Sequence, residues 1–221
     1  MNLARGRTLL GMAILLLFSD AIFAQTSVPK IAEEVDQHYN HLRSLQANFT
    51  EIYRGAGISR QESGTLWLKR PGKMRWEYQQ PREKFFISNG KEAWFYVPGE
   101  QQARRTPMKK LEDLRSPLGY LLGKTKLRKE FEALSLAPDV PPLNPGDVVL
   151  RGVPRFIQSV TQVVMEIAPG GRITRLVADG ADGSTTEYRF ANQKENLEMT
   201  DRQFQFTPPP GVQVIEGEAG Q

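Results

Sequence analysis

The chain has 221 residues, of which 24% are charged, with a formal net charge of +4 and no cysteine. So mild a positive charge does not indicate a nucleic-acid-binding protein, and the lack of cysteine excludes both a disulfide framework and a thiol that could carry a lipid anchor. The length is compatible with one all-β domain.

The first 24 residues have the features of a secretory signal peptide. Two arginines precede an apolar run at residues 9–18, and small Ala24 precedes polar residues. The run is shorter than the roughly 18 apolar residues that a membrane helix needs. We therefore predict a cleaved signal peptide at residues 1–24, export, and one mature domain at residues 25–221. Ile22 is unusual three positions before a cut, so an uncleaved anchor is the alternative.

The mature domain is predicted to open with one helix and then to consist mainly of strands. Apolar residues recur at three- and four-residue steps from Val28 to Leu45, which is typical of an amphipathic helix. The period then changes to two, with Phe49 and Glu51 on one side of a first strand at residues 46–53. Proline and glycine clusters separate further predicted strands at residues 64–69, 74–79, 84–88, 92–97, 147–153, 160–168, 172–178, 184–191 and 204–207.

Residues 108–131 break this pattern. Leucines occur there in short helix-like groups that Pro117 and Gly123 interrupt, which predicts one or two short helices. Consecutive hairpins with so few crossover helices indicate a single antiparallel sheet, and a sheet this large must curl. We therefore predict a mainly β fold with some α structure, in which short helices cover the concave face of a curled sheet.

The sequence has few residue patterns that are typical of an enzyme or a metal site. His38 and His41 are the only histidines, and they lie three apart on the predicted helix without a cysteine, so a solvated helix face explains them better than a metal site. Glu51, Glu62 and Glu77 lie on strands and could form an acid pair, but alternation in sheets often produces such pairs. We predict no enzymatic activity, no metal and no cofactor.

Large apolar side chains gather on the predicted strands. Met74, Trp76 and Tyr78 occupy one side of their strand. Neighbouring strands are expected to add aromatic side chains to the same surface: Trp67, Trp94 and Tyr96. An ordinary core is an alternative explanation. The few covering helices instead favour a concave apolar surface, and Arg70 stands at a turn where a lid could meet it, since a half-buried arginine needs acceptors.

Several blocks of the sequence resemble one family. Residues 64–81 read GTLWLKRPGKMRWEYQQP, residues 88–91 read SNGK and residues 93–98 read AWFYVP. Together with AxFT at residues 47–50, SPLGYLL at 116–122 and FQFTPP at 204–209, they resemble the outer-membrane lipoprotein carrier family, LolA. The resemblance covers most of the mature chain.

The resemblance implies an incomplete β-barrel of about ten or eleven strands. Its helical lid would close a cavity for the acyl chains of lipoproteins. In the family, the arginine of the RP turn hydrogen-bonds to lid backbone carbonyls and keeps the cavity closed, and Arg70 matches that position. Leu118, Leu121 and Leu122 match lid residues that face the cavity. The other expected cavity residues lie on strands: Phe49, Met74, Trp76 and Tyr78.

The function implied is that of a monomeric periplasmic chaperone. It would accept lipoproteins from an inner-membrane ABC exporter and carry them to an outer-membrane receptor, without a cofactor and without binding nucleic acid. Two alternatives use the same scaffold: an enzyme that acts on an amphiphilic substrate in the apolar cavity, and a sensor of lipid or of envelope stress. Turnover that depends on a strand carboxylate would favour the enzyme, and a partner signalling domain would favour the sensor.

Overall fold

The structure is a computed structural model that describes residues 27–108 and 126–217 of the chain. The predicted signal peptide and most of the predicted lid, including Leu118, Leu121 and Leu122, lie outside the described residues. Within residues 126–131, a single helical turn, α3 (Leu127–Glu130), is present.

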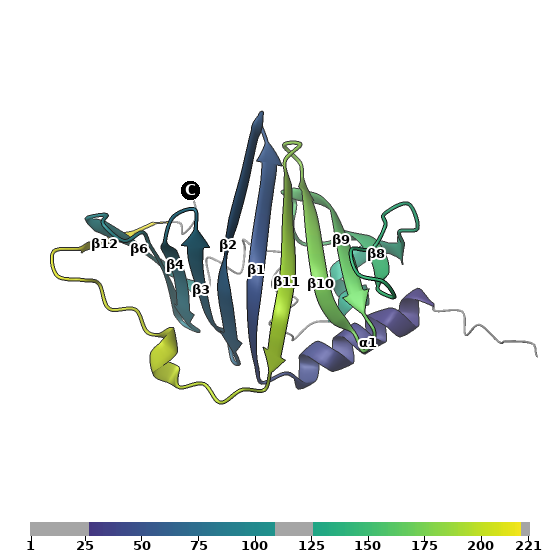
Figure 1. Cartoon of the computed structure of the whole chain (residues 1–221), viewed down its shortest axis with the longest axis horizontal. Helices are drawn as coiled ribbons and strands as arrows, with labels where there is room; N and C mark the ends of the chain where they lie inside the picture. Colours follow the sequence, from purple (N-terminus) through teal and green to yellow (C-terminus); the bar gives the residue numbers. More distant parts are fainter. Residues whose placement is uncertain (1–26, 109–125, 218–221) are drawn as a thin grey trace, which may run out of the picture.

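In the described chain, twelve strands form one sheet (Figure 1). It is antiparallel throughout except that its short last strand runs parallel to β6. The spatial order is β12-β6-β5-β4-β3-β2-β1-β11-β10-β9-β8-β7, so β12 and β7 remain as edges and the barrel is incomplete. The strands are β1 (Ser44–Gly55), β2 (Ile58–Lys69), β3 (Lys73–Gln80), β4 (Lys84–Asn89), β5 (Glu92–Tyr96), β6 (Gln102–Pro107), β7 (Phe131–Leu136), β8 (Val148–Pro154), β9 (Val160–Ala168), β10 (Arg172–Gly180), β11 (Thr185–Glu195) and β12 (Gln213–Glu216). The predicted fold class is confirmed.

The strand prediction needs correction at four places. Neither β6 nor β7 was expected: β6 lacks clear alternation, and β7 begins at Phe131, the last residue of the segment predicted to be helical. The strand expected at residues 204–207 is wrong. Phe204 ends a short 3-10 helix, η2 (Asp201–Phe204), residues 205–207 have no regular structure, and the last strand is β12. The described sheet therefore has one strand more than the upper number that the resemblance implied.

Helix α1 (Val28–His41) is the long helix of the described chain. Its buried residues, Ile31, Ala32, Val35 and Tyr39, follow the three- and four-residue spacing of one helical face. The helix is shorter than predicted: Leu42 is already extended, with φ −67° and ψ 128°, and Leu45 belongs to β1.

The turn between β9 and β10 packs directly on α1. A Cβ atom at Gly171 would lie 2.3 Å from the backbone oxygen of Glu34, and the φ of +86° also favours glycine. The Ile173 amide donates a 2.9 Å hydrogen bond to the Tyr39 hydroxyl oxygen. Asp36 accepts a 2.8 Å bond from the Leu127 amide, which joins α3 to the same helix. These contacts hold α1 across one end of the strands (Figure 1).

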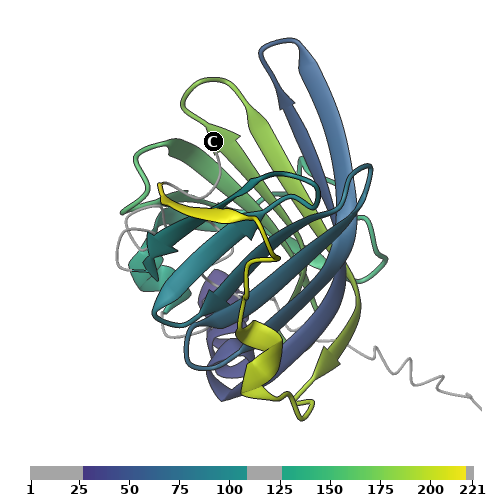
Figure 2. The same cartoon turned by 90° about the vertical axis from the view of Figure 1, so that its left-hand side faces the viewer.

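The C-terminal segment covers the outer face of the sheet. Figure 2 shows it crossing in front of β3 to β6 with α1 behind them. Phe204 is fully buried, and the ring of Phe206 lies 6.4 Å from Trp94 and 5.5 Å from Tyr96. Arg75, opposite Trp67 in the register, donates a 3.0 Å bond to the backbone oxygen of Gln203 in this segment.

These contacts correct one expectation. Trp67, Trp94 and Tyr96 do not extend the surface formed by Trp76, because they point to the outer face of the sheet. Alternation along β3 places Arg75 and Trp76 on opposite faces, and the register aligns Trp67 with Arg75 and Leu66 with Trp76. Trp94 and Tyr96 form an apolar patch beneath Phe206 of the C-terminal segment.

Candidate functional site

The concave face of the sheet carries a continuous aromatic surface, built by cross-strand pairing. In the register, Leu66 faces Trp76 and Trp76 faces Phe86, while Gly64 lies between Phe49 and Tyr78. The ring of Phe49 contacts those of Trp76 and Tyr78 edge to face at 4.7 Å and 4.9 Å. Offset and edge-to-face contacts of this kind stabilise aromatic clusters beyond the area they bury.

Glycine at position 64 is required for this arrangement. A Cβ atom there would lie 1.8 Å from the backbone oxygen of Glu77 on the adjacent strand. The bare backbone leaves room for Phe49 and Tyr78 to meet across it, as their 4.9 Å ring separation shows. A glycine within a strand often marks such a close approach.

The second half of the chain completes the surface. Tyr188 lies 5.9 Å from Trp76, and its ring stacks on Phe190 at 6.3 Å with an interplanar angle of 4°. Sequence reasoning did not single out either residue. The alternation of Thr186, Tyr188 and Phe190 within the predicted strand at residues 184–191 is the signal that could have identified them.

The predicted cavity residues on strands share this surface. Phe49 and Trp76 are buried in the core cluster, with exposed fractions of 2% and 5%, and Met74 and Tyr78 are half-buried against it. The aromatic surface is thus buried at Phe49 and Trp76 and partly exposed at Met74 and Tyr78. The cavity role of these four residues stays a prediction.

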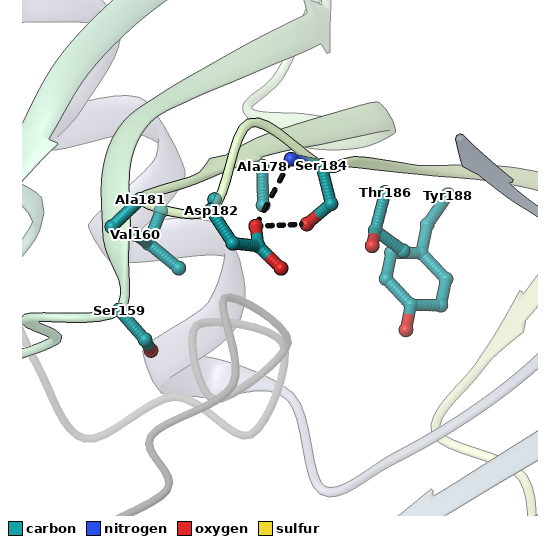
Figure 3. Close-up of a pocket in the computed structure, with 9 residues that line it drawn as sticks. Ser159, Val160, Ala178, Ala181, Asp182, Ser184, Thr186 and Tyr188 are labelled. Atoms are coloured by element: carbon teal, nitrogen blue, oxygen red, sulfur yellow. Dashed lines mark hydrogen bonds between the residues drawn. The ribbon is translucent and has the colours of Figure 1, made fainter. Parts of the chain in front are cut away.

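A cavity of about 450 Å³ lies beside the aromatic surface (Figure 3). Its volume is within the about 300–1,000 Å³ typical of small-molecule sites. The residues that line it are Ser159, Val160, Ala178, Gly180, Ala181, Asp182, Ser184, Thr186 and Tyr188. The β10–β11 turn is at the end of the sheet opposite α1 (Figure 1). Within the turn, the amide and hydroxyl of Ser184 donate to Asp182 at 3.0 Å and 2.6 Å.

A group of polar side chains, which we call the polar collar, lies on the concave face between the aromatic surface and the open end. It consists of Glu51, Arg60, Glu62, Tyr78, Lys84 and Tyr188. In the register, Glu51 stands directly opposite Glu62 on one side and Tyr188 on the other, and Lys84 is opposite Tyr78. The Tyr78 hydroxyl donates a 2.8 Å hydrogen bond to Glu51.

The charges of the polar collar are partly desolvated. Lys84 Nζ donates a 2.7 Å bond to Glu62 and lies 4.0 Å from the centre of the Tyr78 ring, while Arg60 Nε is 3.3 Å from the same carboxylate. Burial raises the pKa of the Glu51 carboxyl above its ordinary value. Burial, together with the nearby Glu51, also raises the pKa values of Tyr78 and Tyr188, so both hydroxyls keep their protons.

Arg70, at the end of β2, reaches the last turn of α1. Its guanidinium donates hydrogen bonds to the backbone carbonyl oxygens of Tyr39 and Asn40, the latter at 2.9 Å. These are among the four carbonyls that lack a partner within the helix, at the end where the helix dipole attracts a cation. Desolvation lowers the pKa of Arg70 from its ordinary value. The carbonyls it contacts belong to α1, so its role as a latch for the lid stays a prediction.

The described histidines have protein partners. His38 Nε2 lies 3.1 Å from a carboxylate oxygen of Glu195, and His41 Nδ1 lies 2.7 Å from the backbone oxygen of Gln37. His38 therefore packs against β11, whereas the sequence predicted a solvated position. In residues 27–108 and 126–217, no group of three or more histidine, aspartate or glutamate side chains could hold a metal ion. No helix within those ranges is long and apolar enough to span a bilayer.

Comparison with known proteins places the chain in a family. The family model of the outer membrane lipoprotein carrier protein LolA matches residues 40–207. An outer-membrane lipoprotein carrier protein from Dechloromonas aromatica (strain RCB) is 30% identical, with 90% of this chain and 95% of that protein covered. One from Sodalis glossinidius (strain morsitans) is 28% identical, with 89% and 95% covered.

Among solved structures, a LolA superfamily protein from Nitrosomonas europaea aligns with a TM-score of 0.45 and 13% identity, covering 82% of this chain and 98% of that one. The match of the family model extends from the end of α1 to the segment after η2 and includes every strand except β12. The chain belongs to the LolA family of outer membrane lipoprotein carrier proteins.

Proposed function

We propose that this protein is a periplasmic carrier that binds the acyl chains of lipoproteins on the concave face of its sheet. It takes them from an inner-membrane ABC exporter and delivers them to an outer-membrane receptor. The observation that carries the proposal is the aromatic concave surface with a cavity of about 450 Å³ beside it. The names of the relatives support the choice of ligand.

A carrier must replace the membrane for its ligand. Each methylene that leaves water contributes about 0.8 kcal/mol, so a lipoprotein with several long chains leaves a bilayer very slowly without help. Large apolar side chains such as Phe49, Trp76 and Tyr188 can supply the replacement surface. Met74 adds a flexible thioether that tolerates chains of different shape.

Release must occur without nucleotide hydrolysis in the periplasm. The two hydrogen bonds from Arg70 to α1 favour the closed state of the empty protein, so opening for a ligand costs their free energy. The loaded state is then held weakly, and the ligand passes to a receptor with a better-fitting site. Because this cycle needs no chemical step, the proposed carrier is not an enzyme. The proposal also includes a monomeric state and export by the signal peptide predicted at residues 1–24.

Depletion of the protein in the organism that makes it tests this function. We expect outer-membrane lipoproteins to accumulate in the inner-membrane fraction, while outer-membrane proteins without acyl chains are sorted normally. Lipoproteins that reach the outer membrane at the usual rate would contradict the carrier role. Recovery of lipoproteins with cleaved acyl chains only when the protein is present would indicate an enzyme.

A further inference from the structure

The polar collar is unusual for the concave face of such a sheet. Two glutamates, Glu51 and Glu62, face each other directly across antiparallel strands, an arrangement that destabilises a sheet unless it is compensated. The Glu62 side chain is only 8% exposed, and burial of a carboxylate costs free energy unless it is paired. Two apolar side chains in place of Glu51 and Glu62 would stabilise the folded state more, so the collar indicates a binding role.

Among the described residues, 27–108 and 126–217, the hydrogen bonds of the collar leave donors to spare. Glu51 is engaged by the hydroxyl of Tyr78, so Glu62 is the carboxylate that Lys84 and Arg60 share, at 2.7 Å and 3.3 Å. An ammonium has three N–H donors and a guanidinium has five. Arg60 is 54% exposed and Lys84 is 19% exposed, so both side chains retain surface that a ligand can contact.

The position of the collar fits one end of an acyl chain. Phe49 and Glu51 are two residues apart on β1, and therefore point to the same face with a separation of about 7 Å along the strand. Tyr188 belongs both to the collar and to the wall of the cavity, where Figure 3 shows it next to Thr186. Methylenes on the aromatic surface would therefore place a polar end group beside Lys84 and Arg60.

An acyl chain always ends in a carbonyl group, which accepts hydrogen bonds and cannot donate them. We propose that Lys84 and Arg60 form a subsite that binds the ester or amide carbonyl oxygens through which acyl chains join their head group. Glu62 pairs with both cations and fixes their positions, and Lys84 also makes a cation–π contact with the ring of Tyr78. The proposal rests on the proposed function and specifies which part of the ligand the polar side chains recognise.

Two synthetic ligands test the subsite on the mature protein. One is a glyceryl-cysteine lipopeptide with ester-linked octanoyl chains, and the other is its analogue with ether-linked octyl chains, which lacks the carbonyl oxygens. Their dissociation constants are measured for the wild type and for Lys84→Met. We expect the ester-to-ether preference of the wild type to exceed that of the variant by about tenfold, the loss expected for one charge-assisted hydrogen bond.

Comparing the two proteins cancels the difference in water solubility between the two ligands. Lys91→Met, the same change at an exposed lysine of the β4–β5 turn, serves as the control and should keep the wild-type preference. Arg60→Gln provides a second variant at an exposed site, with an expected loss of similar size. A preference that is unchanged in Lys84→Met and Arg60→Gln would overturn the subsite and leave the carrier function standing. Failure of the wild type to bind either ligand would overturn both proposals.

Discussion

Replacing Arg70 with methionine removes the guanidinium that joins β2 to the last turn of α1. A net hydrogen bond to a charged group contributes about 1.5–3 kcal/mol, and a cation at a helix C-terminus about 0.3–1 kcal/mol. The Asn40 carbonyl is accessible to water, which can replace the lost donor, so only the bond to the Tyr39 carbonyl is counted in full. We expect a total loss of about 2 kcal/mol, equivalent to a factor of about 30 in an equilibrium constant.

Two measurements report this loss separately. The mature variant should unfold at a temperature about 4–8 °C lower, because 1 kcal/mol shifts the midpoint of a domain of this size by about 2–4 °C. If Arg70 holds the closed state, the dissociation constant for an acylated lipopeptide should also fall by up to about 30-fold, since binding no longer requires these bonds to break. Quenching of the fluorescence of Trp76 on titration with the lipopeptide provides the binding signal.

The control is Arg82→Met, which removes an arginine whose side chain is 63% exposed and pairs with Glu100. It should change both quantities little, because exposed ion pairs contribute at most about 1 kcal/mol. If Arg70→Met lowers the unfolding temperature but binds the lipopeptide with wild-type affinity, then Arg70 caps α1 without acting as a latch. The reasoning about release would then be wrong.

Two further predictions concern the concave face. Gly64→Ala should lower the free energy of unfolding by about 3 kcal/mol, because the added methyl group would collide with the backbone of Glu77. Burial raises the pKa of Glu51 above 4.5, so the folded state holds this proton more tightly than the unfolded chain, and stability falls as the pH rises from 4.5 through the raised pKa. Glu51→Gln, which keeps an acceptor for Tyr78, should therefore gain stability relative to the wild type across that window.

Urea unfolding checks both predictions. Gly217→Ala is the control for the first, since a Cβ atom there would meet nothing within 4 Å, and equal effects of the two glycine changes would contradict the steric argument. For Glu51→Gln, unfolding is measured at a series of pH values. A difference from the wild type that stays constant with pH would show that Glu51 titrates alike in the folded and unfolded states.

Period-two alternation predicted most of the sheet and the side chains that share each strand face. It could not predict which face is concave. Trp76 and Trp94 are both large apolar residues within alternating strands, yet Trp94 lies on the outer face under Phe206. Both faces of β5 are apolar because the C-terminal segment covers the outer one, and that contact joins residues more than a hundred positions apart.

The missed elements have local causes. Phe204 and Phe206 alternate as in a strand, but Phe204 is buried in η2, where an aromatic anchor needs no strand partner. Phe131 follows Leu127 by four residues and continues a helical spacing, although the chain turns into β7 at that point. In both places, tertiary packing overrides the local pattern.

The candidate site was predictable only in part. The aromatic residues of β3 followed from alternation, and Arg70 from the resemblance to the family. The polar collar was predicted only in part: Glu51 and Glu62 were named as members of a possible acid pair, but the β1–β2 register that makes them neighbours and the cations beside them were not predicted. Tyr188 reaches the same place from the far end of the chain by pairing with Glu51.

The central claim is that acyl chains bind on the concave face, and site-specific photo-crosslinking tests it most directly. A photoreactive phenylalanine analogue is placed at Tyr188, which lines the cavity, or at Arg189, the next residue on the same strand, which is exposed on the opposite face. After irradiation with an acylated lipoprotein, the account predicts a crosslink to the acyl chains from position 188 and none from position 189. Equal crosslinking at both positions, or crosslinking from position 189 alone, would contradict it.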